Sequence, residues 1–266
     1  VIDNELWSEI SSEGDLCLGT NCPYFDKCFF MQARKEVYSA DILVVNHHLL
    51  IADARLKYEL NDESGVLPHY NNLIIDEAHN FSDIATKHLG KSFYFKSLNK
   101  FIENLNDNKY SIIPTIRNDI SNNKLDDKKE LFKLLDNKIS PLVKKIDEYS
   151  KIYYNILDSF YNENSSDYQL RIKENIILTD DWHDLYESGD KLLGYLTNLN
   201  YYFKDLYEEI LLRESLDEEM EESIMELEAI LNRLSKLINN LDFNLRVEED
   251  DYVFWLEKRS KRKDSK

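Results

Sequence analysis

Residues Leu73 to Asn80, with the sequence LIIDEAHN, hold the side chains best suited to chemistry in this chain. An apolar run ends directly in Asp76 and Glu77, and α/β proteins place functional groups at the ends of such buried strands. Carboxylate oxygens are the ligands that Mg²⁺ prefers, so we predict that Asp76 holds a magnesium ion through its water shell. Glu77 would polarise a water that attacks a nucleotide phosphate, and His79 would sense the phosphate or an adjacent domain. The alternative is a strand followed by a solvated helix N-terminus, where acidic residues are favoured in any case.

Three cysteines, Cys17, Cys22 and Cys28, lie within twelve residues, and the remainder of the chain has none. An odd and tightly clustered set is a poor disulfide framework and indicates a metal site in a reducing cytoplasm. Zinc ribbons and fingers use two cysteine pairs with two to four residues between the members, and this triplet does not provide two such pairs. The spacing suits an iron–sulfur cluster better, although a cubane cluster normally takes four thiolates. The alternative is that all three are small apolar side chains in a core.

Lys27, Arg34 and Lys35 alternate with aromatic residues on an expected helix. Basic and aromatic side chains together can follow a phosphate backbone and stack on unpaired bases, which makes these three residues candidate nucleic-acid ligands. An aromatic core with a solvated basic face is the alternative, and the sequence alone favours it. His47 and His48 follow an apolar run, where histidines are commonly hydrogen-bonded, so neither is assigned to a metal.

Residues Ala85 to Ser92 imitate the phosphate-binding pattern GxxxxGK(S/T), but Ala85 stands in place of the first glycine and no strand leads into the segment. We interpret it as the end of the helix that follows the acidic motif. The first 100 residues contain no other segment of this kind. A chain that has magnesium-binding carboxylates but no phosphate cradle is predicted not to hydrolyse ATP by itself.

Short apolar runs are expected to position these residues. Ile42–Val45 and Leu73–Ile75 each have the length of a fully buried strand, and each is followed by polar residues. Two further stretches, residues 168–174 and 252–257, alternate between apolar and polar side chains and are also predicted to be strands.

The chain from about residue 93 onward is predicted to be mainly helical. Apolar residues recur at alternating steps of three and four, which is typical of long helices packed at shallow angles, from Leu135 to Phe160, Leu192 to Ile210 and Met220 to Leu241. Ser140 and Pro141 mark either a boundary between two helices or a kink in one. A break near Glu214 is expected to join the last two helices as an antiparallel hairpin, with the acidic run from Glu208 to Glu228 at its solvated tip.

The composition agrees with a helical protein that carries much surface charge. The 266 residues include 33 basic and 51 acidic side chains, a formal net charge of −18, with only 6 glycines and 4 prolines. So few turn-forming residues exclude a fibrous chain and disfavour an all-β sandwich. The acidic balance argues against a chain that coats nucleic acid through bulk charge, although a local basic groove is compatible with it. No apolar run has the length of a membrane helix and no secretory signal opens the sequence, so we expect a cytoplasmic protein.

The order of these pieces resembles DinG-type helicases, which belong to the XPD-like branch of superfamily 2 and are iron–sulfur DNA helicases that move 5′ to 3′. The resemblance rests on the cysteine triplet, Ala33-Arg34, the segment Ala40–His47, Leu67-Pro68 and the DEAH residues Asp76–His79. It is close over residues 15 to 92 and mainly architectural beyond them. It implies a predominantly α fold, in which a helical arch insertion of long antiparallel helices accompanies a few short strands left from an α/β, RecA-like motor domain.

The resemblance also implies domain boundaries. Residues 1–40 would be part of the iron–sulfur cluster domain, 41–92 part of the first motor domain, 93–250 the helical arch, and 251–266 a return strand and a basic tail. The chain starts at Val1 rather than Met, and we expect it to be the middle part of a longer protein.

In such a helicase Asp76 and Glu77 would be the Walker B pair, and Cys17, Cys22 and Cys28 would be three of the four ligands of a [4Fe–4S] cluster. The fourth cysteine and the phosphate-binding loop would lie before Val1. The parent protein would use ATP and Mg²⁺ to unwind single-stranded or forked DNA substrates in repair or replication, as a monomer and without a membrane, its arch and cluster regions forming the strand-separating wedge. The isolated chain is expected to be inactive and to hold an incomplete cluster or none.

Two alternatives stay open on the sequence. The heptad faces could bind a partner helix, which would make the chain an interaction module and an obligate oligomer. The chain could also belong to a DinG-like nuclease or a zinc-binding DNA module, which an upstream exonuclease sequence or zinc in place of iron would favour.

Overall fold

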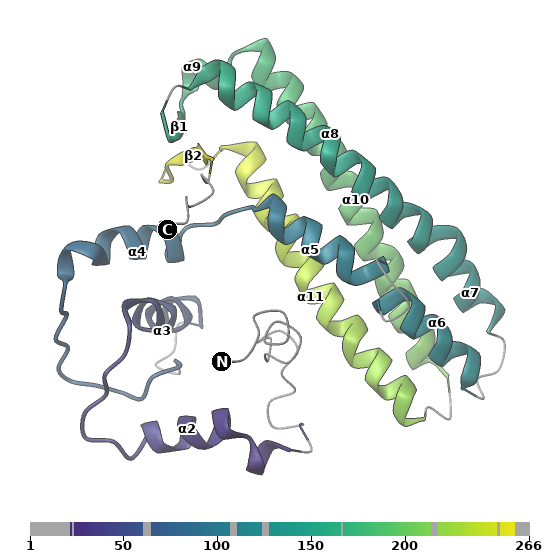
Figure 1. The fold of residues 1–266 in the computed structure, drawn as a ribbon, viewed down its shortest axis with the longest axis horizontal. Helices are drawn as coiled ribbons and strands as arrows, with labels where there is room; N and C mark the ends of the chain where they lie inside the picture. The colour runs from purple at the N-terminus through teal and green to yellow at the C-terminus, as the bar shows by residue number, and fades with distance from the viewer. Residues whose placement is uncertain are drawn as a thin grey trace, which may run out of the picture. The chain divides into compact units, whose positions relative to one another are not determined.

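Long helices make up most of the chain (Figure 1), which confirms the predicted predominantly α fold. The computed structural model describes residues 22, 24–60, 65–106, 111–123, 128–165, 167–213, 217–248 and 251–258. The chain divides into two compact units, Val1–Lys91 and Ser92–Lys266. No helix within the described ranges is long and apolar enough to cross a membrane.

In the described residues of the N-terminal unit, short helices are joined by loops. Its elements are the 3-10 helix η3 (Phe25–Lys27), the helices α2 (Phe29–Val37) and α3 (His47–Leu60), the 3-10 helix η4 (Ala78–Asn80) and the helix α4 (Phe81–Leu89). Helix α3 begins where Asn46 Oδ1 accepts a hydrogen bond from the amide of Leu49 at 2.8 Å, which is a side-chain cap. Helices α3 and α4 pack against each other. The segment that imitates a phosphate-binding loop lies on α4 and just beyond it, as predicted.

A buried carboxylate fixes the loop that follows α3. Asp53 is fully buried, its Oδ1 accepts a hydrogen bond from the amide of Leu67 at 2.8 Å, and its Oδ2 accepts one from Lys57 Nζ at 2.8 Å. Gly65 passes so close that a Cβ atom there would lie 2.1 Å from Asp53 Oδ1. Because this loop leads to the DEAH residues, Asp53 fixes the start of the segment that carries them.

The two apolar runs predicted to be fully buried strands form no strand in the described chain. Ile42 and Val44 are 82% and 95% exposed, and Ile74 is 94% exposed. An apolar run is buried as a strand only where neighbouring strands supply its hydrogen bonds and cover its faces. The described residues of this unit supply no such neighbours. The prediction is therefore wrong for this chain, and both runs present apolar side chains to solvent.

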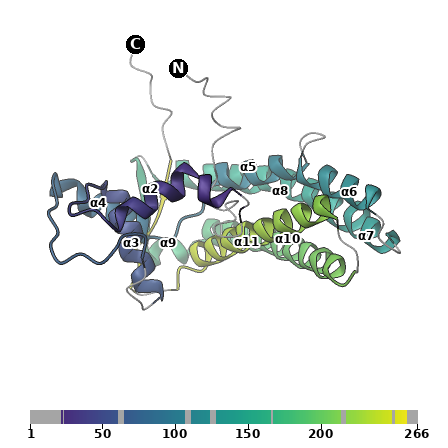
Figure 2. The ribbon, with the colours of Figure 1, turned by 90° about the horizontal axis from the view of Figure 1, so that it is seen from below.

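The C-terminal unit is an antiparallel bundle of helical columns (Figure 1). Its helices are α5 (Phe95–Asn106) and α6 (Ile112–Asn122) in the first column, α7 (Lys129–Leu134), the π-helix η5 (Leu135–Ile139) and α8 (Ser140–Asn164) in the second, then α10 (Asp180–Leu211) and α11 (Glu218–Arg246). A single turn, α9 (Glu174–Ile177), precedes α10. Figure 2 shows α10 and α11 as one layer beneath α5, α6 and α8.

The second column is one helical backbone rather than two helices. The residues at its internal boundaries, Leu134, Leu135 and Ser140, have right-handed helical dihedral angles, so α7, η5 and α8 follow one another without a break. Pro141 lies in the first turn of α8 and has no amide hydrogen to donate to the carbonyl four residues earlier. The π turn directly before it is the local change that Ser140 and Pro141 mark in the sequence.

The last two helices begin at side-chain caps and form the predicted hairpin. Thr179 Oγ1 accepts a hydrogen bond from the amide of Trp182 at 3.2 Å, and Asp217 Oδ1 accepts one from the amide of Met220 at 3.0 Å. Helices α10 and α11 pack against each other, and the heptad positions between them, such as Leu196, are fully buried inside this unit. The interaction-module alternative needs these faces to be open to a partner, so the observed packing disfavours it.

Three helices come into close contact at Gly189 of α10. A Cβ atom there would lie 2.5 Å from Leu245 Cδ2 of α11 and 3.1 Å from the hydroxyl oxygen of Tyr153 of α8. Tyr153 is buried in this contact, and burial raises the pKa of its hydroxyl group. The glycine therefore permits an approach that a larger residue would prevent.

A two-stranded antiparallel sheet joins distant parts of this unit. Strands β1 (Gln169–Ile172) and β2 (Phe254–Glu257) pair so that Leu170 lies opposite Leu256 and Ile172 opposite Phe254. Leu170 and Ile172 are buried while their neighbours along β1 are exposed, which is the alternation that predicted both strands. Both strand predictions are confirmed.

The chain enters and leaves the helical unit on neighbouring turns of α8. Phe95, the first residue of α5, packs edge-on against Tyr154 with ring centres 5.2 Å apart. Lys258, just after β2, forms an ion pair with Asp158 at 2.6 Å, and this hydrogen-bonded contact lowers the pKa of the Asp158 carboxyl. Tyr154 and Asp158 are four residues apart, which is about one helical turn.

Candidate functional site

The DEAH residues lie on a turn that leads into α4. Glu77 has left-handed dihedral angles, φ 48° and ψ 42°, and its carbonyl oxygen accepts a hydrogen bond from the amide of Asn80 at 3.0 Å. This conformation costs a non-glycine residue roughly 1–2 kcal/mol. Strained residues of this kind persist where the surrounding structure fixes them, and they are frequent at active sites.

Glu77 and His79 form a contact within this turn. His79 Nδ1 lies 3.3 Å from Glu77 Oε2, and both side chains are largely exposed. The left-handed backbone of Glu77 and the 3-10 turn that follows bring these two side chains together. An exposed carboxylate beside an imidazole can accept a proton from a water and have its orientation fixed by the ring.

Asp76 is held in place by two hydrogen bonds. Its Oδ1 accepts one from the amide of Glu77 at 3.0 Å, and its carbonyl oxygen accepts one from His47 Nε2 at 2.9 Å. Because a carbonyl oxygen can only accept, the Nε2 atom of His47 carries the hydrogen. His47 also packs edge-on against Phe81 with ring centres 5.8 Å apart. The expectation that His47 is hydrogen-bonded agrees with this contact, whereas its partner Asp76, 29 residues away, was not foreseen.

The oxygen atoms of Asp76 fit the predicted magnesium ligand. Within the described part of the chain the Oδ2 atom makes no hydrogen bond, and the side chain is exposed. One free carboxylate oxygen can hold Mg²⁺ directly or through a water of its hydration shell. The three predicted residues Asp76, Glu77 and His79 therefore lie on one exposed turn, with His47 as an additional positioning residue.

Two further contacts fasten the helices on either side of this turn. The Nδ1 atom of His48, on α3, and the Nε2 atom of His88, on α4, form a short hydrogen bond. Arg55 Nη1 donates a hydrogen bond to the carbonyl oxygen of His88 at 3.0 Å. These contacts hold the start of α3 near the end of α4, and so support the His47–Asp76 hydrogen bond.

The cysteines are only partly described. Cys17 lies outside the described residues, while Cys22 and Cys28 are half-buried free thiols. Cys28 is the N-cap residue of α2. Over the described ranges no group of three or more possible ligands is gathered to hold a metal ion. The two thiols have the chemistry of cluster ligands, and neither is deeply buried as an ordinary packing residue would be.

The candidate nucleic-acid residues lie on and beside α2, whose aromatic residues do not form a core. Phe29 is 87% exposed and Phe30 is 61% exposed, and none of the residues of α2 is buried. Lys35 Nζ lies 5.3 Å from the centre of the Phe25 ring, and Arg34 Cζ lies 5.9 Å from that of Phe30. The aromatic-core interpretation is therefore wrong for the described residues. Lys27, in η3, is exposed as well, so the helix presents cations and open aromatic rings together.

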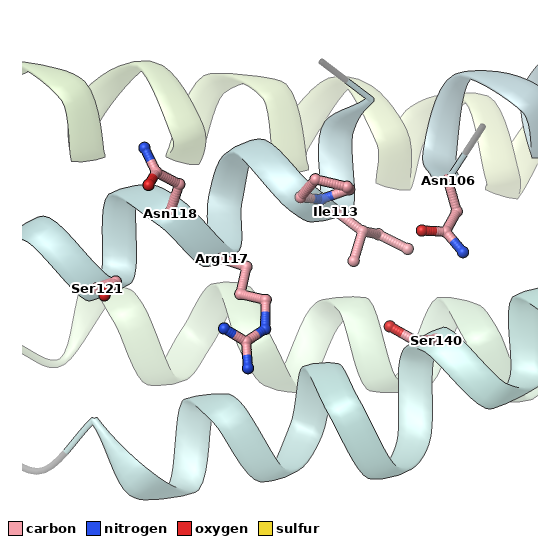
Figure 3. Close-up of a pocket in the computed structure, with 7 residues that line it drawn as sticks. Asn106, Ile113, Arg117, Asn118, Ser121 and Ser140 are labelled. Atoms are coloured by element: carbon pink, nitrogen blue, oxygen red, sulfur yellow. The ribbon is translucent and has the colours of Figure 1, made fainter. Parts of the chain in front are cut away.

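A pocket of about 370 Å³ in the helical unit is a structural feature rather than a second site (Figure 3). Its lining includes Asn106, Ile113, Arg117, Asn118, Ser121 and Ser140. The Arg117 guanidinium already donates two hydrogen bonds to the carboxylate of Asp136, at 3.0 and 2.9 Å. These hydrogen bonds raise the pKa of the Arg117 guanidinium. An anion would have to displace this carboxylate, so the pocket offers no ready charge for a ligand.

Comparison with known proteins identifies relatives over part of the chain, while no family model matches it. The ATP-dependent DNA helicase YoaA of Escherichia coli (strain K12) is 40% identical over 99 residues, which is 36% of this chain and 15% of that protein. YoaA of Haemophilus influenzae is 36% identical over 107 residues, or 39% of this chain and 16% of that protein. The ATP-dependent DNA helicase DinG of Escherichia coli (strain K12) is 36% identical over 84 residues, or 32% of this chain and 11% of that protein.

These matches span no more than 16% of the length of the relatives. They agree with the resemblance drawn from the cysteine spacing and the DEAH residues. This chain is thus similar to a piece of the DinG-type ATP-dependent DNA helicases.

Proposed function

We propose that this chain is part of an ATP-dependent DNA helicase in which Asp76 and Glu77 serve ATP hydrolysis. The observation that carries the proposal is the similarity of about a third of the chain to YoaA and DinG, which are named ATP-dependent DNA helicases. The exposed turn that holds Asp76, Glu77 and His79 supports it, because these residues are free to face a nucleotide.

The proposed hydrolysis step assigns one task to each residue of the turn. Glu77 accepts a proton from the attacking water. The oxygen of this water bonds to the γ-phosphorus, and the bond between the γ-phosphorus and the oxygen that leaves with ADP breaks. His79, 3.3 Å from the Glu77 carboxylate, orients that carboxylate. Asp76, held by His47, binds Mg²⁺, which when bound neutralises charge on the phosphates. The phosphate-binding loop belongs to the parent protein outside this chain.

The remaining assignments concern DNA and the proposed cluster. Cys17, Cys22 and Cys28 would bind an iron–sulfur cluster that braces the wedge between the two DNA strands. The exposed cations and aromatic rings of α2 would contact single-stranded DNA beside it. Residues 93–250 would form the arch over the DNA path, and residues 251–266 would return to the motor domain.

Replacing Glu77 in the parent protein tests the proposal. The Glu77→Gln variant keeps the shape of the side chain but removes the base, so DNA-stimulated phosphate release should fall by about 10²- to 10⁴-fold. Binding of ATP, measured with a fluorescent analogue, should change little because Asp76 is intact. Glu148→Gln is the matched control, since Glu148 is an exposed carboxylate of α8 in the helical unit. A Glu77→Gln protein that hydrolyses ATP at the rate of the control would refute the assignment.

A further inference from the structure

The helical unit has a second groove, which differs in charge from the chain as a whole. It lies between α5 and α8, has a volume of about 680 Å³, and is lined among others by Phe95, Lys96, Asn99, Lys100, Lys151 and Tyr154. Its lining has three lysines against one carboxylate, that of Glu103. The chain carries a net charge of −18, whereas the lining of this groove is net positive. A groove of this sign attracts an anionic ligand.

The lysines are placed to contact successive anionic groups. Lys96 and Lys100 are four residues apart on α5, so they lie on one face with a rise of about 6 Å between them. Both are exposed, and Lys96 has no ion-pair partner in the described ranges. Lys151 lies across the groove on α8 and pairs with Asp147 at 2.7 Å. This exposed pair is weak, so a phosphate can replace the carboxylate.

The remaining lining is suited to unpaired bases. Tyr154 is 46% exposed, and its ring is steadied by the edge-on contact with Phe95. A held and open aromatic ring can stack on a base with little loss of side-chain freedom. The side-chain amides of Asn99 and Asn155 have no hydrogen-bond partner among the described residues, and each can both donate and accept a hydrogen bond. Stacking of this kind needs a base whose face is open, which a duplex does not present.

We infer that the groove between α5 and α8 binds single-stranded DNA, with Lys96, Lys100 and Lys151 on the phosphates and Tyr154 stacked on a base. The inference rests on the proposed function for the choice of DNA as the ligand. It assigns a DNA-contacting face to the helical unit, separate from the residues of α2.

Binding of a labelled oligothymidylate of about 20 nucleotides to the chain, followed by fluorescence anisotropy at about 50 mM salt, tests this assignment. The Lys96→Glu/Lys100→Glu variant should weaken binding by tenfold or more. Its slope of log affinity against log salt should shrink by about 1.4, the expectation for two lost phosphate contacts on a single strand. Lys129→Glu/Lys191→Glu is the matched control, because it changes two exposed lysines of the same unit and the same total charge. Equal loss of affinity in both variants would overturn the inference.

The aromatic contact is tested separately, since α2 also offers aromatic rings. Tyr154→Leu should weaken binding of the oligonucleotide about fivefold or more. Tyr154→Phe should bind about as tightly as the unmodified chain, because the aromatic ring is kept. Photo-crosslinking with an oligonucleotide that carries 5-iododeoxyuridine should label the peptide that contains Tyr154. Crosslinks confined to residues 24–38, or tighter binding of a duplex of equal length, would contradict the assignment.

Failure of this inference is distinguishable from failure of the proposed function. No measurable binding of the oligonucleotide to the unmodified chain would overturn the groove assignment. The comparison of Glu77→Gln with Glu148→Gln in the parent protein leaves the groove unchanged in both variants, so its outcome tests the proposed function and not the groove.

Discussion

Glu226 shows how a single side chain can couple the helical unit to pH. It lies on α11, is partly buried, and its Oε2 atom has no hydrogen-bond partner in the described chain. Burial raises the pKa of its carboxyl group, and the carboxylates of Asp119 and Glu222 raise it further. Asp119 on α6 accepts a hydrogen bond from Ser223 Oγ at 2.7 Å, so the acidic groups meet where α6 packs on α11. The expected solvated tip is therefore partly buried at this residue.

The sign of the effect follows from the direction of the pKa shift. A carboxyl group whose pKa is raised by folding favours the folded state below its ordinary pKa, and that stability is lost as the pH rises through the raised value. Glu226→Gln stays neutral, so it should raise the melting temperature at neutral pH by about 2 to 4 °C and have little effect near pH 4. Thermal melts across this pH range, with the exposed Glu228→Gln as the control, measure the difference. A constant difference between Glu226→Gln and wild type at all pH values would contradict this explanation.

The candidate active site could be predicted in part from single residues. Asp76, Glu77 and His79 are nearly contiguous, so their proximity follows from the chain itself. The hydrogen bond between His47 and Asp76 joins residues that are 29 positions apart and depends on how α3 meets α4. The only feature of the sequence that indicated this hydrogen bond is that polar residues follow each of the apolar runs Ile42–Val45 and Leu73–Ile75. The left-handed conformation of Glu77 had no signal, because glutamate does not favour it.

The two glycines of α10 give opposite expectations. At Gly194 a Cβ atom would meet nothing within 4 Å, so Gly194→Ala should stabilise the helix by about 0.5 to 1 kcal/mol through higher helix propensity. At Gly189 the Cβ atom would lie 2.5 Å from Leu245 Cδ2, so Gly189→Ala should gain nothing or destabilise the bundle. Urea denaturation followed by the helical circular dichroism signal measures both changes. Equal stabilisation by the two substitutions would show that Leu245 moves aside freely.

Helices and strands could be predicted where the spacing of their apolar residues reflects packing against elements of the same unit. The first of the three segments with steps of three and four forms η5 and α8, and the other two form α10 and α11. The two alternating stretches form β1 and β2. Each of these elements finds its partner within the same unit. The prediction of a buried strand at Ile42–Val45 was wrong, because such burial depends on neighbouring strands that the described chain does not provide. A continuous apolar run therefore predicts a need for partners, whereas an alternating run predicts one covered face.

The exposed apolar runs have a consequence for the chain in solution. Val44 and Ile74 are at least 94% exposed, and both lie in short apolar segments whose backbone forms no sheet. Unpaired apolar segments of this kind can pair with another chain. The net charge of −18 opposes such association, and salt screens this repulsion. We therefore expect the isolated chain to self-associate, and more strongly as the salt concentration rises.

Light scattering against salt concentration measures this tendency. A Val44→Lys/Ile74→Lys variant should associate less than the unmodified chain at every salt concentration, because it places charge within both runs. Leu178→Lys/Leu212→Lys is the matched control, since those side chains are 78% and 79% exposed in the helical unit and lie outside the two runs. Equal suppression by both variants would show that the two runs do not cause the association, since both variants change the net charge equally.

The first and last segments of the helical unit both pack on one stretch of α8, and this makes the unit a removable module. Phe95 and Lys258 reach α8 at positions one turn apart, so the segments that flank the bundle meet at its base. A module with adjacent ends can be inserted into a host loop, deleted from it or exchanged for another without forcing the flanking elements apart. Changes in length are then tolerated at the far end, where α6 meets α7 and α10 meets α11. Bundles of different lengths could thus be grafted onto the same flanking segments.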